Sequence, residues 1–243
     1  MNIIKLDAIN STNDYIKMLL ARQFVENFTI VSAENQTSGR GQMGSAWDVE
    51  GGKNLTFSVL VRDLLIEINQ IFHLNVAVAV SIIEALSFYE IKELSIKWPN
   101  DILAEGKKIG GILIENSIKS NGEIFSIVGI GLNVNQKNFD NLPKASSLSV
   151  LKNQEFEKQE IFASVVQNLG RNISLVMNGN TEQIWDKYHQ FLYKKGVPMP
   201  FENAQKDKFM GIIQGVSQSG KLEVKVDNEA IKTFEIKEVK MLY

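Results

Sequence analysis

The sequence has 243 residues, of which 44% are hydrophobic and 22% are charged, and its formal net charge is −2. This composition is ordinary for a globular protein and allows one large domain, or a main domain with a small one. The interspersed charges exclude a basic stripe that would bind DNA, the lack of cysteine excludes disulfides and thiolate metal sites, and the lack of a long apolar run or signal segment predicts a cytoplasmic protein with no membrane span.

The N-terminal segment is predicted to form two strands separated by a helix. The runs NIIKL and FTIVSAE are rich in β-branched side chains, and Ser11 or Thr12 is placed to cap the helix between them. The segment ENQTSGRGQMGSAW, residues 34–47, follows the second strand directly. Its three glycines and few packing residues cannot hold one conformation cheaply, so we expect this loop to close around a ligand.

The middle of the chain is predicted to form a buried helix and several strands. Residues 54–61 predict a strand, and residues 68–90 are apolar on nearly every side, which is typical of a core helix. The β-branched runs over residues 94–118 and 122–135 are joined by turn signals, the tightest being SNG at 120–122. Consecutive strands with short connections favour an antiparallel or mixed sheet.

The residue pattern changes in the C-terminal part of the chain. Helical patterning extends over residues 158–192, and from Gly196 the runs VPMPF, FMGIIQGV, LEVKV and IKTFEI alternate with glycine and polar turns. Short strands at this spacing are typical of a small barrel. We therefore expect an α+β fold with a main domain over residues 1–194 and a small domain over residues 195–243.

The sequence has few candidates for nucleophilic or metal chemistry. The two histidines, His73 and His189, lie far apart, and we interpret His73 as a core or boundary histidine within the apolar helix. No phosphate-binding loop of the G-x-x-x-x-G-K-[ST] type occurs, and GIGLN contains only an isolated G-x-G. A covalent enzyme intermediate is therefore not expected.

Four segments combine hydrogen-bonding groups or bare backbone with a strand end: STN at 11–13, GRGQMGSAW at 39–47, KWPNDI to KKIGG at 97–111, and GIGLN at 129–133. Each alone has a plainer interpretation. STN can be a helix cap, PND a turn, and the paired glycines bulges or close strand crossings. Together they predict one cleft.

In this order the segments resemble the motifs of the biotin protein ligase family, which read G-R-G-R-x-G-R-x-W, K-W-P-N-D, K-[LI]-x-G-I-L-[IV]-E and G-x-G-[IL]-N. The chain has GRGQMGSAW, KWPNDI, KIGGILIE and GIGLNV. The resemblance is strong over residues 3–150 and weaker beyond. It implies a class II synthetase-like catalytic domain, with a mixed, largely antiparallel sheet packed with helices, and a C-terminal SH3-like β-barrel.

The resemblance also implies an ATP-dependent ligase. The carboxylate of biotin would attack the α-phosphate of ATP, and a lysine of a biotin carboxyl carrier protein would then attack the resulting biotinyl-AMP. Both substrates bring their own nucleophiles, so the protein needs to position and neutralise charge. Mg²⁺ would arrive with ATP, near Asp101, and not at a fixed protein site. The ligase pattern starts within a few residues of Met1, so we expect a form without the N-terminal DNA-binding domain of some members, acting as a monomer or homodimer.

The positions of the motifs imply the site residues. Lys108 and Arg40 are expected to be catalytic, with Lys108 screening the repulsion between the carboxylate and the α-phosphate; on residue type alone Lys97 competes for that role. Several small polar side chains would offset the desolvation of the biotin urea. The expected biotin contacts are Ser11, Thr12, Asn13, Gln36, Gly39, Arg40, Gly41, Lys108, Gly111, Gly129 and Gly131. The expected ATP or adenylate contacts are Arg40, Gly41, Gln42, Trp47, Lys97, Asn100, Asp101, Lys108 and Asn133.

The loop departs from the family pattern. Gln42 and Ser45 stand where relatives usually carry arginine, and Arg40 is the loop's only cation. Fewer charge-assisted contacts predict a weaker hold on the adenylate. Two alternatives follow: a lipoyl or octanoyl protein ligase of the same superfamily, and a non-catalytic sensor of biotin or nucleotide. The GRGxxG loop and KWPND favour the biotin branch.

Overall fold

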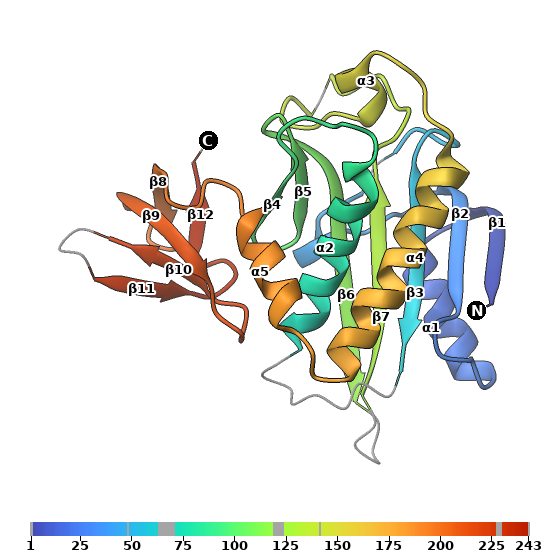
Figure 1. Ribbon diagram of the computed structural model, residues 1–243. Helices are drawn as coiled ribbons and strands as arrows, with labels where there is room; N and C mark the ends of the chain where they lie inside the picture. Colours follow the sequence, from blue (N-terminus) through green and yellow to red (C-terminus); the bar gives the residue numbers. More distant parts are fainter. Residues whose placement is uncertain are drawn as a thin grey trace.

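The structure is a computed structural model, and it describes residues 2–47, 49–62, 71–118, 124–140, 142–226 and 230–242. Figure 1 shows a large sheet covered by helices and, beside it, a smaller C-terminal sheet. The turn predicted at 120–122 and the first residues of the helix predicted from residue 68 lie outside the described ranges. Within these ranges, no helix is both long and apolar enough to cross a lipid bilayer.

Seven strands form the large sheet in the spatial order β1-β2-β3-β7-β6-β5-β4. β1 and β2 pair in parallel, and the other neighbouring strands of this sheet pair antiparallel. The mixed, largely antiparallel sheet expected from the sequence is therefore confirmed. The strands are β1 Ile3–Ile9, β2 Ile30–Gln36, β3 Leu55–Val61, β4 Ser95–Lys97, β5 Asp101–Ala104, β6 Lys107–Ile118 and β7 Ile124–Leu132.

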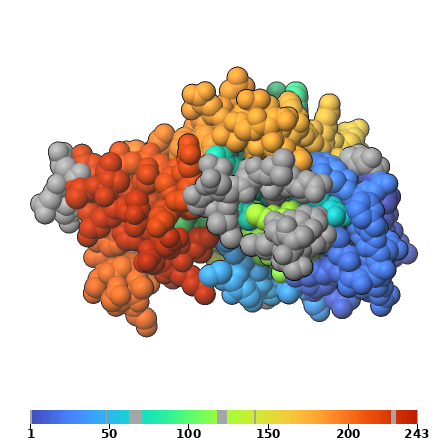
Figure 2. Space-filling view, turned by 90° about the horizontal axis from the view of Figure 1, so that it is seen from below, coloured from blue at the N-terminus to red at the C-terminus, as the bar shows by residue number. Residues whose placement is uncertain are grey.

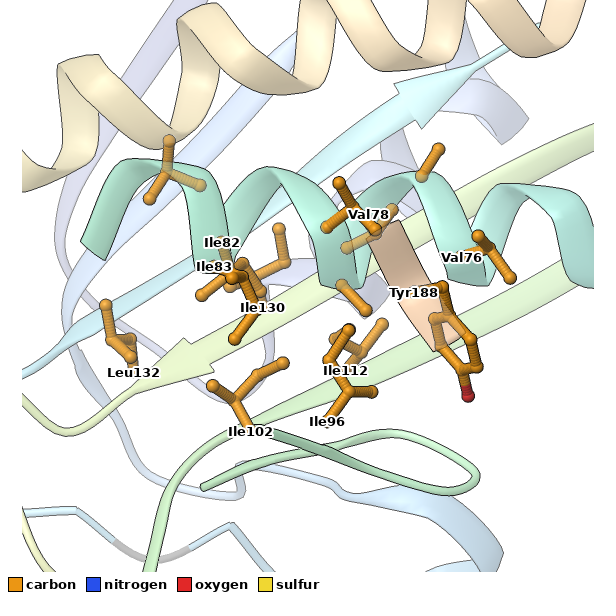
Figure 3. Packing of buried hydrophobic residues seen from close by; sticks show 14 of the residues in the cluster. Val76, Val78, Ile82, Ile83, Ile96, Ile102, Ile112, Ile130, Leu132 and Tyr188 are labelled. Atoms are coloured by element: carbon orange, nitrogen blue, oxygen red, sulfur yellow. The ribbon is translucent and has the colours of Figure 1, made fainter. Parts of the chain in front are cut away.

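One face of the large sheet is covered by α2, which spans Phe72–Ser87. It packs on β5 and β6, and α4 lies beside it on the same face of the sheet, where Phe162 packs against Phe57 of β3. In Figure 3, Ile82 and Ile83 of α2 lie close to Ile130 of the sheet. Because α2 is apolar on nearly every side, it can be buried by the sheet, α4 and α5 together.

His73, in the first turn of α2, is buried as the sequence predicts. Its Nδ1 accepts a hydrogen bond from Trp185 Nε1 at 3.1 Å. Burial lowers the pKa of the imidazole, so the ring is neutral in the fold at neutral pH. This geometry supports a structural role for His73.

The helical stretch predicted over residues 158–192 is divided into two helices, α4 Lys158–Met177 and α5 Glu182–Gln190. The chain turns between them at Gly179, whose φ of 73° lies outside the helical region. A short helix that the pattern did not predict, α3 Leu148–Lys152, begins at Ser147, whose side chain accepts a hydrogen bond from Val150 N. Five residues are too few to produce a clear helical period.

The opposite face of the large sheet carries α1, Thr12–Arg22, which starts after its N-cap Ser11. Ile16 packs there with Leu60 and other apolar side chains of the strands. Side chains alternate along a strand, so Ser58 lies on the same face as Leu60, while Phe57 belongs to the core on the α2 face. The α1 face is the one that carries polar groups.

The C-terminal strands form a five-stranded sheet in the order β11-β10-β9-β8-β12, which is consistent with the expected SH3-like domain. Trp98 Nε1 donates to Gly220 O at 2.8 Å and thereby joins this sheet to the main part. Figure 2 shows the C-terminal segments, in red, and the N-terminal segments, in blue, at opposite ends of the molecule. The strands are β8 Pro198–Asn203, β9 Lys208–Val216, β10 Leu222–Lys225, β11 Ile231–Phe234 and β12 Val239–Met241.

Candidate active site

An open pocket lies between the start of α1, the glycine-rich loop, β6 and β7. Most of the predicted site residues meet there: Ser11, Thr12, Asn13, Gln36, Arg40, Gly41, Gln42, Trp47, Asn100, Lys108, Gly111, Gly129 and Gly131. The lining also includes Ser45, Ala46, Phe57, Ile112, Leu113 and Ile130. Segments separated by up to about half of the chain therefore form one site.

One end of the pocket carries a network of small polar groups. Gln36 Oε1 accepts hydrogen bonds from Thr12 N at 2.8 Å and from Thr12 Oγ1 at 3.1 Å. Ser11 caps α1 by accepting from Asp14 N at 3.4 Å. Ser11, Thr12 and Asn13 are almost fully buried, so these hydrogen bonds hold their side chains in fixed orientations. Fixed donors and acceptors of this kind suit a ligand with a compact polar ring.

Ser58 and Glu115 complete this network, although the sequence analysis assigned no role to either. Ser58 Oγ lies 2.6 Å from Thr12 Oγ1 and 2.6 Å from Asn13 Oδ1, and Glu115 Oε2 accepts from Asn13 Nδ2 at 2.7 Å. The period of two along a strand is the signal that points to Glu115, because it places this residue on the same face as Gly111.

Glu115 also belongs to a cluster of four charges that joins α1, the loop and β6. Lys17 Nζ lies 2.7 Å from Glu115 Oε1 and 3.6 Å from Asp14 Oδ1. Arg40 forms an ion pair with Asp14 and lies 3.6 Å from Glu115 Oε2. Burial raises the pKa of the Glu115 carboxyl, but Lys17, Asn13 and Arg40 together hold it below its ordinary value. Glu115 is therefore ionised at neutral pH.

Residues 39–47 form a turn that is closed by its own hydrogen bonds. Gly41 N donates to Ser45 O at 2.7 Å, and Ser45 Oγ donates to Gln42 O at 2.8 Å. Gly44 has a φ of 80°, which a residue with a side chain adopts at a cost. Ser45 therefore stabilises the turn itself.

The glycines of β6 and β7 make the floor of the pocket. Gly111 and Gly131 are paired across the two strands, and the indole of Trp47 lies over both. A Cβ at Gly131 would lie 2.3 Å from Trp47 Cε2, and one at Gly129 would lie 2.6 Å from Asn13 Oδ1. Trp47 Nε1 is buried and has no hydrogen-bond partner in the part of the chain that the structure describes. The close approach over the floor therefore requires glycine.

Lys108 and Lys97 share the carboxylate of Asp101. Lys108 Nζ lies 2.6 Å from Asp101 Oδ1, and Lys97 Nζ lies 3.1 Å from Asp101 Oδ2. Lys108 Nζ also lies 5.6 Å from the centre of a Trp47 ring. The side chain of Lys108 is 35% exposed and lines the pocket, whereas that of Lys97 is 18% exposed and lies outside the lining. This placement favours Lys108 as the cation that meets a ligand.

Asp101 is a poor candidate for a magnesium ligand in this arrangement. Each of its carboxylate oxygens faces a lysine ammonium, so a further cation would have to displace one of them. No group of three His, Asp or Glu residues within the described ranges is arranged to hold a metal ion. The expectation that Mg²⁺ arrives with ATP stays a prediction.

Gly39 and Asn133 lie outside the lining of the pocket. A Cβ at Gly39 would lie 2.3 Å from Trp47 O, so a glycine here allows the two ends of the loop to approach each other. Asn133 is buried, and its Nδ2 donates to Ser146 O at 3.0 Å. The predicted contact of Asn133 with adenine stays a prediction.

The chain matches a family model and is similar to several known proteins. The Biotin/lipoate A/B protein ligase family matches residues 6–135. The chain is 32% identical, over 173 residues, to the bifunctional ligase/repressor BirA of Bacillus spizizenii, covering 69% of this chain and 51% of that protein. It is 26% identical, over 234 residues, to the biotin–[acetyl-CoA-carboxylase] ligase of Mycobacterium tuberculosis, covering 93% and 85%. The chain thus spans about half the length of the Bacillus relative.

Among solved structures, the chain is similar to the biotin protein ligase from Aquifex aeolicus in complex with biotin and ATP. The TM-score is 0.81 at 26% identity, and the match covers 99% of this chain and 98% of that one. The family match includes the glycine-rich loop, Lys108 and the floor glycines, so it contains most of the pocket. The chain belongs to the Biotin/lipoate A/B protein ligase family.

Proposed function

We propose that this protein is an ATP-dependent biotin–protein ligase. The observation that carries the proposal is the lining of the pocket, which combines a fixed polar network around Thr12, Asn13 and Gln36 with two cations, Arg40 beside that network and Lys108. Such a pocket suits a small molecule with a hydrogen-bonding ring and a carboxylate tail. The similarity to an Aquifex protein whose structure holds biotin and ATP supports the same substrates here.

In the first proposed step, a carboxylate oxygen of biotin attacks the α-phosphorus of ATP, and the bond to pyrophosphate breaks. Two anions must approach each other, and the Lys108 ammonium, which lines the pocket, reduces their repulsion. The Arg40 guanidinium, which also lines the pocket, is a further donor for the developing charge. Catalysis therefore consists of positioning and charge neutralisation.

In the second proposed step, a neutral lysine amine of the acceptor attacks the carbonyl carbon of biotinyl-AMP. The bond from this carbon to the AMP oxygen breaks, an amide forms, and the amine releases a proton. The adenylate is sensitive to water. The Trp47 indole, at the end of the loop, covers Gly111 and Gly131, and its proposed role is to exclude water from the site.

The remaining assignments rest on the sequence. We propose a catalytic domain over residues 1–194 and an SH3-like domain over residues 195–243, with a biotin carboxyl carrier protein as the acceptor. A cytoplasmic location, a monomeric or homodimeric state and the lack of a DNA partner stay predictions. The roles of the individual site residues are proposals of the same kind.

The test is to mix the purified protein with ATP, Mg²⁺, biotin and a biotin carboxyl carrier domain, and to follow the mass of the acceptor. We expect a mass gain of one biotinyl group that requires ATP and is lost when the acceptor lysine is replaced by arginine. A gain only with lipoate or octanoate would favour the lipoyl ligase alternative. Biotin binding without adenylate formation would favour the sensor. Either result contradicts the proposal.

A further inference from the structure

The amide of Asn13 lies between the Ser58 hydroxyl, which can donate or accept a hydrogen bond, and the Glu115 carboxylate, which can only accept. Ser58 Oγ lies 2.6 Å from Oδ1, and Glu115 Oε2 lies 2.7 Å from Nδ2. An ionised carboxylate can only accept, so the atom of Asn13 that faces it must be the NH₂ group. The Glu115 carboxylate therefore determines which way the amide points.

We infer that Glu115 is a positioning residue that makes Asn13 a hydrogen-bond donor toward the pocket and so selects a ligand with a carbonyl acceptor, such as a cyclic urea. The inference rests on the proposed function, which supplies biotin as the ligand. One hydrogen of Asn13 Nδ2 is used by Glu115. The second is the donor left for a ligand, since Asn13 lines the pocket.

The position of Glu115 on β6 explains why it reaches Asn13. Leu113 pairs with Gly129 across β6 and β7, and Asn13 packs on Gly129. Glu115 is two residues further along the same face of the strand, so its carboxylate meets the start of α1. No side chain at position 129 separates the two elements.

The surroundings of Glu115 keep its carboxylate charged and in place. Lys17 Nζ lies 2.7 Å from the other carboxylate oxygen, Oε1, Arg40 lies 3.6 Å from Oε2, and the Glu115 side chain is 26% exposed. A flipped Asn13 amide would set Oδ1 against the carboxylate, and two acceptors repel each other. The flipped form, which would present an acceptor to the ligand, is therefore disfavoured.

Four variants distinguish this role from a loss of stability. Glu115→Leu removes the charge and the acceptor, and Glu115→Gln keeps an acceptor on a side chain of the same length. Lys17→Met removes the ammonium that pairs with Glu115 and lies near Asp14, and Ser58→Ala removes the hydroxyl beside Asn13 Oδ1. The measurements are the Kd of biotin by calorimetry without ATP, and the KM for biotin, KM for ATP and kcat in ATP–pyrophosphate exchange. Thermal unfolding of each variant reports on stability independently.

We expect Glu115→Leu to weaken biotin binding by ~10- to 100-fold, because a charge-assisted hydrogen bond orients the donor. Its KM for biotin should rise by a similar factor, while kcat at saturating biotin and the KM for ATP change by less than ~3-fold. Glu115→Gln should recover biotin binding to within ~5-fold of wild type, and Lys17→Met to within ~3-fold. Ser58→Ala, which deletes one oxygen, should weaken biotin binding by ~5-fold or more.

Wild-type affinity for biotin in both Glu115→Leu and Ser58→Ala would overturn the inference, as would equal losses in Glu115→Gln and Glu115→Leu. A parallel fall in kcat and rise in both KM values would assign Glu115 a purely structural role and also overturn it. If Glu115→Leu does not fold, Ser58→Ala and Glu115→Gln decide by the same criteria. Failure of the wild-type protein to bind biotin at all would instead overturn the proposed function.

Discussion

The polar network around Asn13 and the glycine-rich loop both line the pocket, yet they are held by different kinds of contact. In the polar network, Asn13 and Ser58 are 3% and 0% exposed and are hydrogen-bonded to each other. In the loop, Arg40 is held by an ion pair with Asp14, and the two side chains are 43% and 46% exposed. Exposed ion pairs contribute only ~0–1 kcal/mol, whereas buried networks are costly to break.

The difference indicates how one pocket can combine recognition with closure. Recognition of a polar ring needs donors and acceptors whose orientation is set beforehand, since ordering them on binding would reduce the affinity. Closure over a phosphate needs contacts that exchange easily. Arg40 can exchange its exposed ion pair with Asp14 for a stronger contact with a phosphate. The experiments below test this division, starting with the largest expected effect.

Lys108 lies where floor and loop meet, between Asp101 and Trp47. We expect Lys108→Ala to slow adenylate formation by ~10²- to 10³-fold, because the cation acts on developing charge. Biotin binding should change by less than ~3-fold, since the polar end of the pocket is untouched. ATP–pyrophosphate exchange and calorimetry measure the two quantities. Lys107→Ala, at an exposed neighbouring lysine of β6, is the control. Near wild-type exchange in Lys108→Ala would move the catalytic role to Lys97.

Gly129→Ala tests the rigidity of the floor. The new Cβ would lie 2.6 Å from Asn13 Oδ1, and Asn13 cannot move without losing Ser58 or Glu115. We expect biotin binding to weaken by ~10- to 100-fold, as measured by calorimetry. Gly51→Ala is the control, because its Cβ would meet Asn35 at an ordinary 3.5 Å. Unchanged affinity in Gly129→Ala would show that the floor adapts and would remove the contrast with the loop.

Gln42→Arg tests whether the loop lacks a charge. Gln42 lines the pocket, and an arginine there adds a charge-assisted contact to a phosphate. We expect biotinyl-AMP to dissociate ~5- to 10-fold more slowly and bystander proteins to be biotinylated less than by the wild type. Adenylate release in a chase experiment is the measurement, with the exposed Gln214→Arg as control. Equal retention by wild type and Gln42→Arg would mean that other groups already replace the missing arginine.

Asp14→Asn tests the surface pair of the loop and should have the smallest effect. Removing the carboxylate leaves Arg40 with only the more distant Glu115, 3.6 Å away, so the guanidinium is freer to meet a phosphate. We expect the KM for ATP to fall by ~2- to 3-fold, in line with an exposed ion pair. Steady-state exchange kinetics measure it, and Asp140→Asn, at an exposed site outside the pocket, is the control. A rise in the KM for ATP would indicate that Asp14 positions Arg40 for the ligand.

The parts of the molecule that depend on local pattern were predictable from the sequence. The apolar character of α2 and the cap at Ser11 each depend on neighbours within a few residues, as do the positions of the glycines. The same holds for the motif segments, whose order predicts one cleft. Local pattern also has limits, since the helical stretch over residues 158–192 gave no clear sign of the break at Gly179.

The parts that depend on strand order and register required the tertiary structure. Asn13 and Glu115 are 102 positions apart, and Ser58 is 45 positions from Asn13. They meet because β3, β7 and β6 are neighbours in that order and because no side chain stands at Gly129. The exposure of Lys108 compared with Lys97, and the pairing of Arg40 with Asp14, are decided in the same way. Sequence specifies which groups are present, but only packing decides which of them share a hydrogen bond and which face solvent.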